Sequence, residues 1–193
     1  MTSYNSEHDL RVLKAMVAHL TPYLYEDELF GQVDNRLPKL TLGGLLMRLY
    51  RLEQFAEHLS PAQRQDIQEA RKHLEATQYE WLNHYKDKIQ QELPSRINAI
   101  NWYLDDCRQN PVGCDSGWPN EAEKRTIIAH LRDEAERLDI LSRETKGMIS
   151  DLDGRIRHFH KPGAFIWSDD LKPVYPRERF WWLYGRPGEL EEE

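Results

Sequence analysis

The chain has 193 residues, 39% of them hydrophobic and 31% charged, which suits one domain or one domain with an appendage. The formal charge of −7 argues against a chain that binds nucleic acid over its whole surface, because such chains are usually basic. No stretch approaches the ~20 apolar residues of a membrane span, and the N-terminus lacks the pattern of a signal peptide, so we expect a cytoplasmic protein without membrane contact.

Two helices are predicted in the first 59 residues. Leucines and valine recur at spacings of three and four over residues 10–24, which is one apolar stripe of a helix. Pro22 interrupts this stripe, so we expect the helix to restart there with Thr21 as its N-cap. Thr41 opens a second stripe over residues 42–59, whose Gly43-Gly44 pair either weakens the first turn or admits another backbone.

A third helical stripe begins at Ser60-Pro61, an N-cap followed by proline at the first helical position. The stripe runs to Leu93, where Pro94 is expected to break or bend the helix, and it continues on the far side to Cys107. Residues 110–119 consist of turn-forming residues throughout and are predicted to form a loop.

The strongest pattern predicts one long helix from about Pro119 to His160. Apolar and small residues alternate at spacings of three and four from Ile128 to Phe159, widened by Ile127, Leu141 and Met148. A stripe of this width is typical of a helix in a bundle rather than of a two-stranded coiled coil. We therefore predict an all-α fold, an irregular bundle of about five major helices over residues 1–160.

Residues 161–193 differ in character and are predicted to form a strap and an acidic tail packed on or beside the bundle. Residues 164–176 are punctuated by proline and are expected to be extended, whereas residues 177–184 are expected to form two helical turns closed by Gly185. From Arg155 to Arg186 the chain carries seven Lys or Arg against three acids, interleaved with eight aromatic residues.

This basic aromatic segment is the predicted binding site, because Trp, Tyr and Arg dominate protein interfaces. The residues proposed to bind a partner are Arg177, Arg179, Trp181, Trp182 and Arg186. Two other interpretations remain open: aromatic rings and cations also suit single-stranded nucleic acid, and the strap also suits a purely structural role in which its rings cover the bundle. We expect Phe165, Trp167 and at least one of Trp181 and Trp182 to lie against the bundle, with other rings left exposed.

Arg-x4–6-His spacing, the active-site signature of the all-helical HEPN-type ribonucleases, occurs at Arg125–His130, Arg155–His160 and Arg51–His58. The residue types suit phosphate chemistry, because His transfers protons near neutral pH and Arg holds phosphate. With 17 Arg and 8 His in the chain, about two such matches arise by chance. We therefore predict that His130 and His160 are not catalytic.

Acidic residues at a spacing of three, Asp133, Glu136 and Asp139, resemble the magnesium ligands of helical nucleotide hydrolases. They alternate with arginines, which is typical of an ion-paired surface, and Glu-x-x-His, the di-iron pattern, does not occur. We predict no metal site and no cofactor. Cys107 and Cys114 flank Asn110-Pro111, where a disulfide is geometrically possible, but we expect both thiols to be free, because disulfides are rare in the cytosol.

The predicted function is a non-enzymatic interaction or assembly subunit that binds a protein partner or forms a homo-oligomer. The competing hypothesis is an enzyme acting on a phosphate substrate, either a HEPN-like ribonuclease or a metal-dependent nucleotide hydrolase. An Arg–His pair converging in a basic pocket would favour the enzyme, and a flat apolar patch would favour the interaction protein.

Overall fold

The computed structural model describes residues 3–109 and 113–188, so the acidic residues near the C-terminus and the first three residues of the predicted 110–119 loop lie outside the described residues. Within these ranges the chain forms seven α-helices, three short 3-10 turns and one two-stranded sheet. The elements are α1 Ser6–Ala18, α2 Leu20–Tyr25, α3 Leu42–Gln54, η1 Ala56–His58, α4 Pro61–Glu80, α5 Leu82–Gln109, α6 Cys114–Arg137, α7 Arg143–Phe159, β1 His160–Phe165, η2 Asp169–Leu171, η3 Trp181–Leu183 and β2 Tyr184–Pro187. The prediction of an all-α bundle is confirmed.

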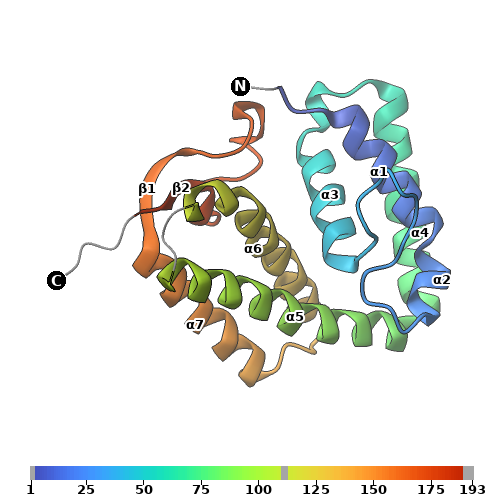
Figure 1. Ribbon diagram of the computed structural model, residues 1–193. Coiled ribbons are helices and arrows are strands. Elements are labelled where there is room, and N and C mark those ends of the chain that lie inside the picture. The colour runs from blue at the N-terminus through green and yellow to red at the C-terminus, as the bar shows by residue number, and fades with distance from the viewer. Residues whose placement is uncertain (1–2, 110–112, 189–193) are drawn as a thin grey trace.

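The helices form two groups that meet along α3 and α6 (Figure 1). Helices α1 to α4 pack together, and α5 connects them to the second group of α6, α7 and the C-terminal segment. Gly43 lies where α3 crosses α6, and a Cβ there would come within 2.8 Å of Leu131 Cδ1 and even closer to Ile127. The glycine therefore admits side chains of the neighbouring helix at this crossing, and its N–H donates a hydrogen bond of 3.0 Å to Glu92 Oε2.

Two predicted helix starts are confirmed by their caps. The Ser60 side chain accepts from the Gln63 N–H, and the Gln63 side chain accepts from the Ser60 N–H, which is a complete capping box. The Thr41 hydroxyl accepts a hydrogen bond from the Gly44 N–H and begins α3. The predicted restart with Thr21 as N-cap is wrong by two residues, since the N-cap is His19 and α2 begins at Leu20.

The prediction of one helix from Pro119 to His160 is wrong. Helix α6 begins earlier, at Cys114, and ends at Arg137, and α7 begins at Arg143 after a new N-cap at Ser142. Asp139 adopts a left-handed conformation with φ 53°, the Asp139 N–H donates to Glu136 O, and the Ile140 N–H donates to Ala135 O. These two hydrogen bonds form a Schellman motif, the standard C-terminal turn of a helix, with Asp in place of the usual Gly.

The apolar stripes of α6 and α7 follow the same three-four spacing on both sides of the break. The sequence pattern therefore gave no sign that the helix ends there. Ile128, Leu131 and Ala135 of α6 are buried, as are Ile149, Leu152 and Ile156 of α7. Between them Leu138 and Leu141 are half-buried and Ser142 is exposed. Of the two outcomes expected at Pro94, a break or a bend, the break is wrong, since α5 runs through this residue and the chain instead breaks at Trp81, between α4 and α5.

The C-terminal segment is largely non-helical, which corrects the prediction of two helical turns over residues 177–184. Only the single 3-10 turn η3 forms, and the chain then enters β2, which pairs antiparallel with β1 from His160–Pro187 to Phe165–Tyr184. Gly185 has φ 137°, and a Cβ there would come within 2.9 Å of the His160 ring and closer still to the Lys161 carbonyl. The strand pairing therefore needs glycine at this position.

Candidate functional site

A groove of about 480 Å³ lies between α6 and α7 beside the C-terminal strap. Its lining residues are Arg132 of α6 and Lys146, Ile149, Ser150, Asp153, Gly154 and Arg157 of α7. On α7, the polar members follow one another at spacings of four, three and four, so that one face of the helix presents them all. We call this feature the basic groove.

Positive charge predominates in the basic groove. Asp153 is its one acidic lining residue, and its carboxylate is occupied by Arg125, which donates from Nε at 2.6 Å and from Nη2 at 2.8 Å. Arg132 pairs with Asp133 at 2.9 Å. Within the described part of the chain, neither Lys146 nor Arg157 forms an ion pair, so both charges are open to a ligand.

Two buried donors near the basic groove also lack acceptors among the described residues. Arg132 Nε and Arg125 Nη1 are buried without a hydrogen-bond partner. An unpaired buried donor costs about 1–3 kcal/mol, so an acceptor supplied from outside would be favourable. Arg132 lines the groove, whereas Arg125 lies behind it and contacts the groove through Asp153.

The strap borders the basic groove through two of the five predicted binding residues. The Arg157 guanidinium lies 4.4 Å from the centre of the Trp181 ring, close enough for a cation–π contact. Arg179 pairs with Asp133, which also binds Arg132, so the strap arginine is tied to the α6 side of the groove. Trp181 and Arg179 therefore lie next to residues of the basic groove, and their role in binding stays a prediction.

The other three predicted binding residues lie elsewhere. Arg177 lies above the Tyr184 ring at 5.7 Å, and Arg186 pairs with Asp115 at 3.2 Å near the start of α6. Trp182 is only 2% exposed, which corrects the assumption that its ring is accessible to a partner. Its Nε1 donates to Thr126 Oγ1 at 3.0 Å and Arg125 covers its ring at 4.0 Å, so Trp182 holds the strap to α6.

The strap packs on the bundle more completely than the sequence predicted. Phe165 and Trp182 are buried and Trp167 is half-buried against the core, as expected. No ring of the described strap is fully exposed, although three are half-buried: Trp167, Trp181 and Tyr184. The strap therefore has a structural role, and Trp181 is the ring that it contributes to the basic groove.

None of the three Arg–His pairs forms a joint site. Arg125 binds Asp153, whereas the His130 ring packs 4.7 Å from the Tyr50 ring. Burial, reinforced by the charges of Arg179 and Arg51, lowers the pKa of His130 to about 3. A histidine that remains neutral above pH 3 is a poor acid or base catalyst at neutral pH.

In the other two Arg–His pairs, the arginine and the histidine also contact different residues. Arg155 donates to Asn101 and Asp105 at 2.6 Å each, whereas the His160 ring lies 5.4 Å from that of Trp181. Arg51 binds Asp9 at 3.0 Å, and the His58 ring instead lies 4.6 Å from that of Phe55.

The structure brings together no metal ligands in the described residues: no group of three His, Cys, Asp or Glu side chains there is placed to hold a metal ion. Asp133 forms ion pairs with Arg132 and Arg179, and Asp139 lies in the turn after α6. Cys107 and Cys114 form a disulfide with a Cα–Cα distance of 5.6 Å, which corrects the expectation of two free thiols.

None of the residues that line the basic groove was among the predicted binding residues, so sequence reasoning missed its cations Arg132, Lys146 and Arg157. The spacing of Lys146, Ser150, Asp153 and Arg157 marks one helix face, but it could not show which face remains open to solvent. Comparison of the chain with protein-family models, with curated proteins and with solved structures found no match.

Proposed function

We propose that this protein is a non-enzymatic interaction subunit that binds an acidic segment of a protein partner in the basic groove. The observation that carries the proposal is the pair of cations, Lys146 and Arg157, that line one groove without ion-pair partners in the described residues. A carboxylate-bearing segment would neutralise both, and Trp181 beside Arg157 offers an aromatic contact typical of protein interfaces.

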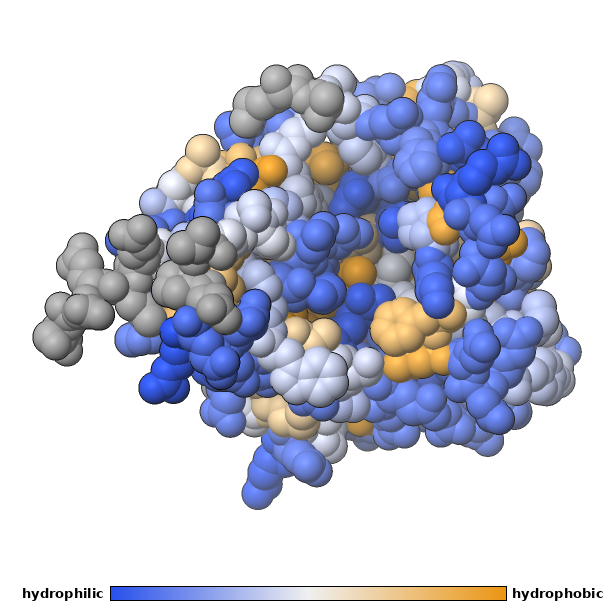
Figure 2. All heavy atoms as spheres, viewed as in Figure 1, coloured by the Kyte–Doolittle hydropathy of each residue, from blue (hydrophilic) through white to orange (hydrophobic). Residues whose placement is uncertain are grey.

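The proposed binding site is defined by charge, because the described surface offers no broad apolar patch on the face in Figure 2. On the face drawn in Figure 2, hydrophilic residues cover most of the surface, and apolar residues appear as small separate groups. The most exposed large rings in the described residues, Tyr79 and Trp102, belong to different helices, α4 and α5. Electrostatic complementarity mainly raises specificity and association rate, so we expect a salt-sensitive contact of moderate affinity.

The experiment compares the wild type with the double variant Lys146→Glu, Arg157→Glu and with a matched control, Arg11→Glu, Lys39→Glu. The control residues are exposed and lie outside the groove. A fluorescent peptide of alternating Glu and Leu is the probe, and a single-stranded oligonucleotide of equal charge is the competitor. We expect the groove variant to weaken peptide binding by about tenfold or more and about 0.5 M salt to do the same, because added salt screens exposed charges.

The control variant should bind the peptide as the wild type does. Equal peptide affinity of the wild type and the groove variant would refute the proposal. A clear preference for the oligonucleotide would favour single-stranded nucleic-acid binding, to which the Arg157–Trp181 pair is also suited.

A cytoplasmic location is likewise proposed, and one finding opposes it. None of the helices in the described residues combines the length and apolar character needed to cross a bilayer. The Cys107–Cys114 disulfide, however, favours an oxidising compartment, because reducing systems keep cytosolic thiols free. Alkylation of the thiols in intact cells, before lysis, decides between the two locations.

A further inference from the structure

A second pocket, of about 420 Å³, lies on the other side of the molecule's centre, between the N-terminal segment, α3, α6 and the loop after β1. Figure 1 shows the N-terminal segment beside this loop at the top of α3. The residues that carry the argument are Tyr4, Arg51, Glu123, Ile166, Trp167 and Leu171. Tyr4 N and Ser3 Oγ both donate to Asp170 Oδ2, at 3.0 and 2.9 Å, which ties the N-terminal wall to the loop.

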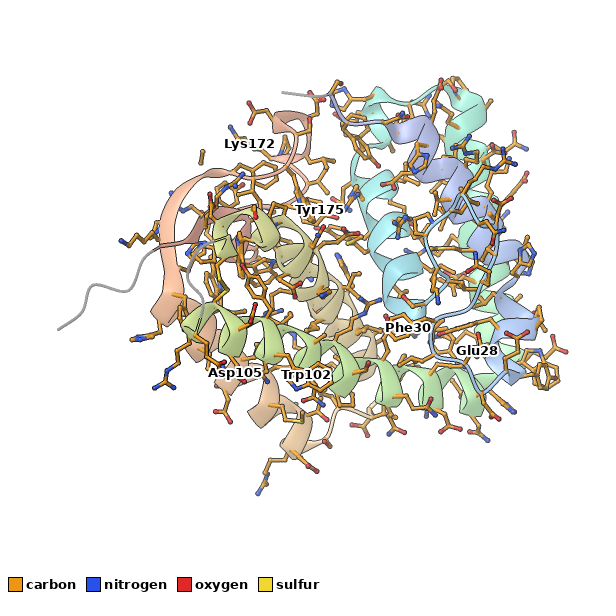
Figure 3. The ribbon with its side chains drawn as sticks, viewed as in Figure 1. Glu28, Phe30, Trp102, Asp105, Lys172 and Tyr175 are labelled. Carbon is orange, nitrogen blue, oxygen red and sulfur yellow. A yellow bond between two sulfur atoms is a disulfide. The ribbon has the colours of Figure 1, made fainter. Side chains whose placement is uncertain are left out.

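Arg51 forms a rigid cationic wall of this pocket. Its Nη1 donates to Asp9 Oδ2 at 3.0 Å and its Nε to the Tyr175 hydroxyl at 3.1 Å. Figure 3 places Tyr175 between α6 and α3. The remaining nitrogen, Nη2, contacts only Met47 Sδ at 3.6 Å, and a thioether is a weak acceptor. Arg51 therefore keeps donor capacity while its position is held.

The charged side chains around the pocket are two cations, Arg48 and Arg51, and two carboxylates, Asp9 and Glu123, and Glu123 acts electrostatically on Arg48. Asp9 is shared by Arg51 and by Arg48, whose Nε lies 3.4 Å from Asp9 Oδ1, so two cations face one carboxylate. Glu123 lines the same pocket and forms no ion pair within the described residues. A simple anion would be repelled by Glu123 and a simple cation by Arg51, whereas a ligand carrying both charges matches the pocket.

The rest of the lining combines three polar residues, Ser3, Asn5 and Ser168, with one apolar and aromatic wall. Trp167 lies over Arg51 at 4.9 Å from its guanidinium carbon, and Ile166 and the buried Leu171 continue this wall. The volume falls within the range of about 300–1,000 Å³ that is usual for small-molecule sites. An apolar group on the ligand would contact this wall while the charged end meets Arg51 and Glu123.

We propose that this pocket binds a free α-amino acid with an apolar side chain, its carboxylate on Arg51, its ammonium on Glu123 and its side chain against Trp167. The probes are L-leucine, N-acetyl-L-leucine, which keeps only the carboxylate, and L-leucinamide, which keeps only the ammonium. Isothermal titration should show L-leucine binding at least about tenfold more tightly than either analogue, because each analogue lacks one of the two charged contacts.

The variant Glu123→Gln separates a designed site from non-specific binding. Glu123 is half-buried and has no ion pair to lose in the described residues, so the variant should fold, and its melting temperature checks this. The Glu123→Gln variant should bind L-leucine about tenfold more weakly than the wild type. It should bind N-acetyl-L-leucine at least as tightly as the wild type, since the repulsion from Glu123 is removed. Glu136→Gln, an exposed position on the same helix, is the matched control and should change nothing.

Three results would overturn the proposal. The first is equal binding of the three probes by the wild type. The second is an unchanged order of affinities in Glu123→Gln. The third is the absence of binding by any of the common amino acids at about 5 mM, a concentration that would detect even weak millimolar affinity.

Discussion

Arg125 of α6 and Asp153 of α7 form a two-pronged ion pair, with Nε–Oδ1 at 2.6 Å and Nη2–Oδ2 at 2.8 Å. Arg125 is 2% exposed and its guanidinium also covers the buried ring of Trp182 at 4.0 Å. Arg125 therefore links α6, α7 and the strap. It also neutralises Asp153, the one acidic residue in the lining of the basic groove.

The first prediction concerns this ion pair. Asp153→Asn should lower the free energy of unfolding by about 3 kcal/mol, because it leaves the buried Arg125 charge without its partner. The double variant Arg125→Met, Asp153→Leu should lower the free energy of unfolding less than Asp153→Asn does, since both charges are then removed. Urea unfolding measures both variants, and a stability of Asp153→Asn equal to that of the wild type would contradict the structural role of the pair.

The second prediction compares two helical glycines. Gly43→Ala places a methyl group against Ile127 and Leu131 and should lower stability by about 1–3 kcal/mol through overpacking. Gly147→Ala meets nothing within 4 Å and should raise stability by up to about 1 kcal/mol, because alanine favours the helix. Thermal unfolding of the two variants should therefore shift in opposite directions. Shifts of the same sign would show that α3 and α6 do not cross closely at Gly43.

The third prediction tests the turn between α6 and α7. At the φ of 53° of Asp139, a branched side chain is strained and glycine is not. Asp139→Val should cost about 1–2 kcal/mol, and Asp139→Gly should be neutral or stabilising by up to about 1 kcal/mol. If Asp139→Val were instead as stable as the wild type, the chain would be a continuous helix at this point.

The fourth prediction concerns pH. Burial lowers the pKa of His130 from 6.5 to about 3, so between these values the unfolded chain binds a proton that the folded chain does not. Stability should therefore fall as the pH drops from about 6.5 towards 3, by up to about 1.4 kcal/mol per pH unit from this group. The free energy of unfolding, measured with denaturant across this range, should depend less steeply on pH in His130→Leu than in the wild type. Parallel curves for the two proteins would mean that His130 is exposed or charged in the folded state.

The fifth prediction concerns the disulfide. Replacing both Cys107 and Cys114 with alanine should lower stability by about 2–3 kcal/mol, as expected for the loss of a short closed loop in the unfolded chain. Because the bond joins the end of α5 to the start of α6, the helical circular dichroism signal should remain. A reductant should destabilise the wild type by a similar amount and leave the double alanine variant unchanged. An equal response of both proteins would show that the thiols are not bonded.

The candidate site was predicted in part. Arg179 and Trp181 were identified because basic and aromatic residues are dense in one stretch of sequence. Arg132, Lys146 and Arg157 were missed, since only the packing of α6 against α7 brings them to one groove. A binding surface assembled from distant segments leaves no local pattern that a single sequence displays.

The sequence by itself determined the features that depend on near neighbours. The helical class and the starts at Thr41 and Ser60 follow from apolar spacing and from caps whose hydrogen bonds span three residues. The tertiary structure decided the turn at Asp139, the burial of Trp182 and the closure of the disulfide. In the first case the apolar stripe continues through the break, so the pattern could not distinguish one helix from two helices packed on the same core. In the other two, Trp182 must reach Thr126 and Cys107 must meet Cys114 across a helix end, and those distances are set only when the helices pack.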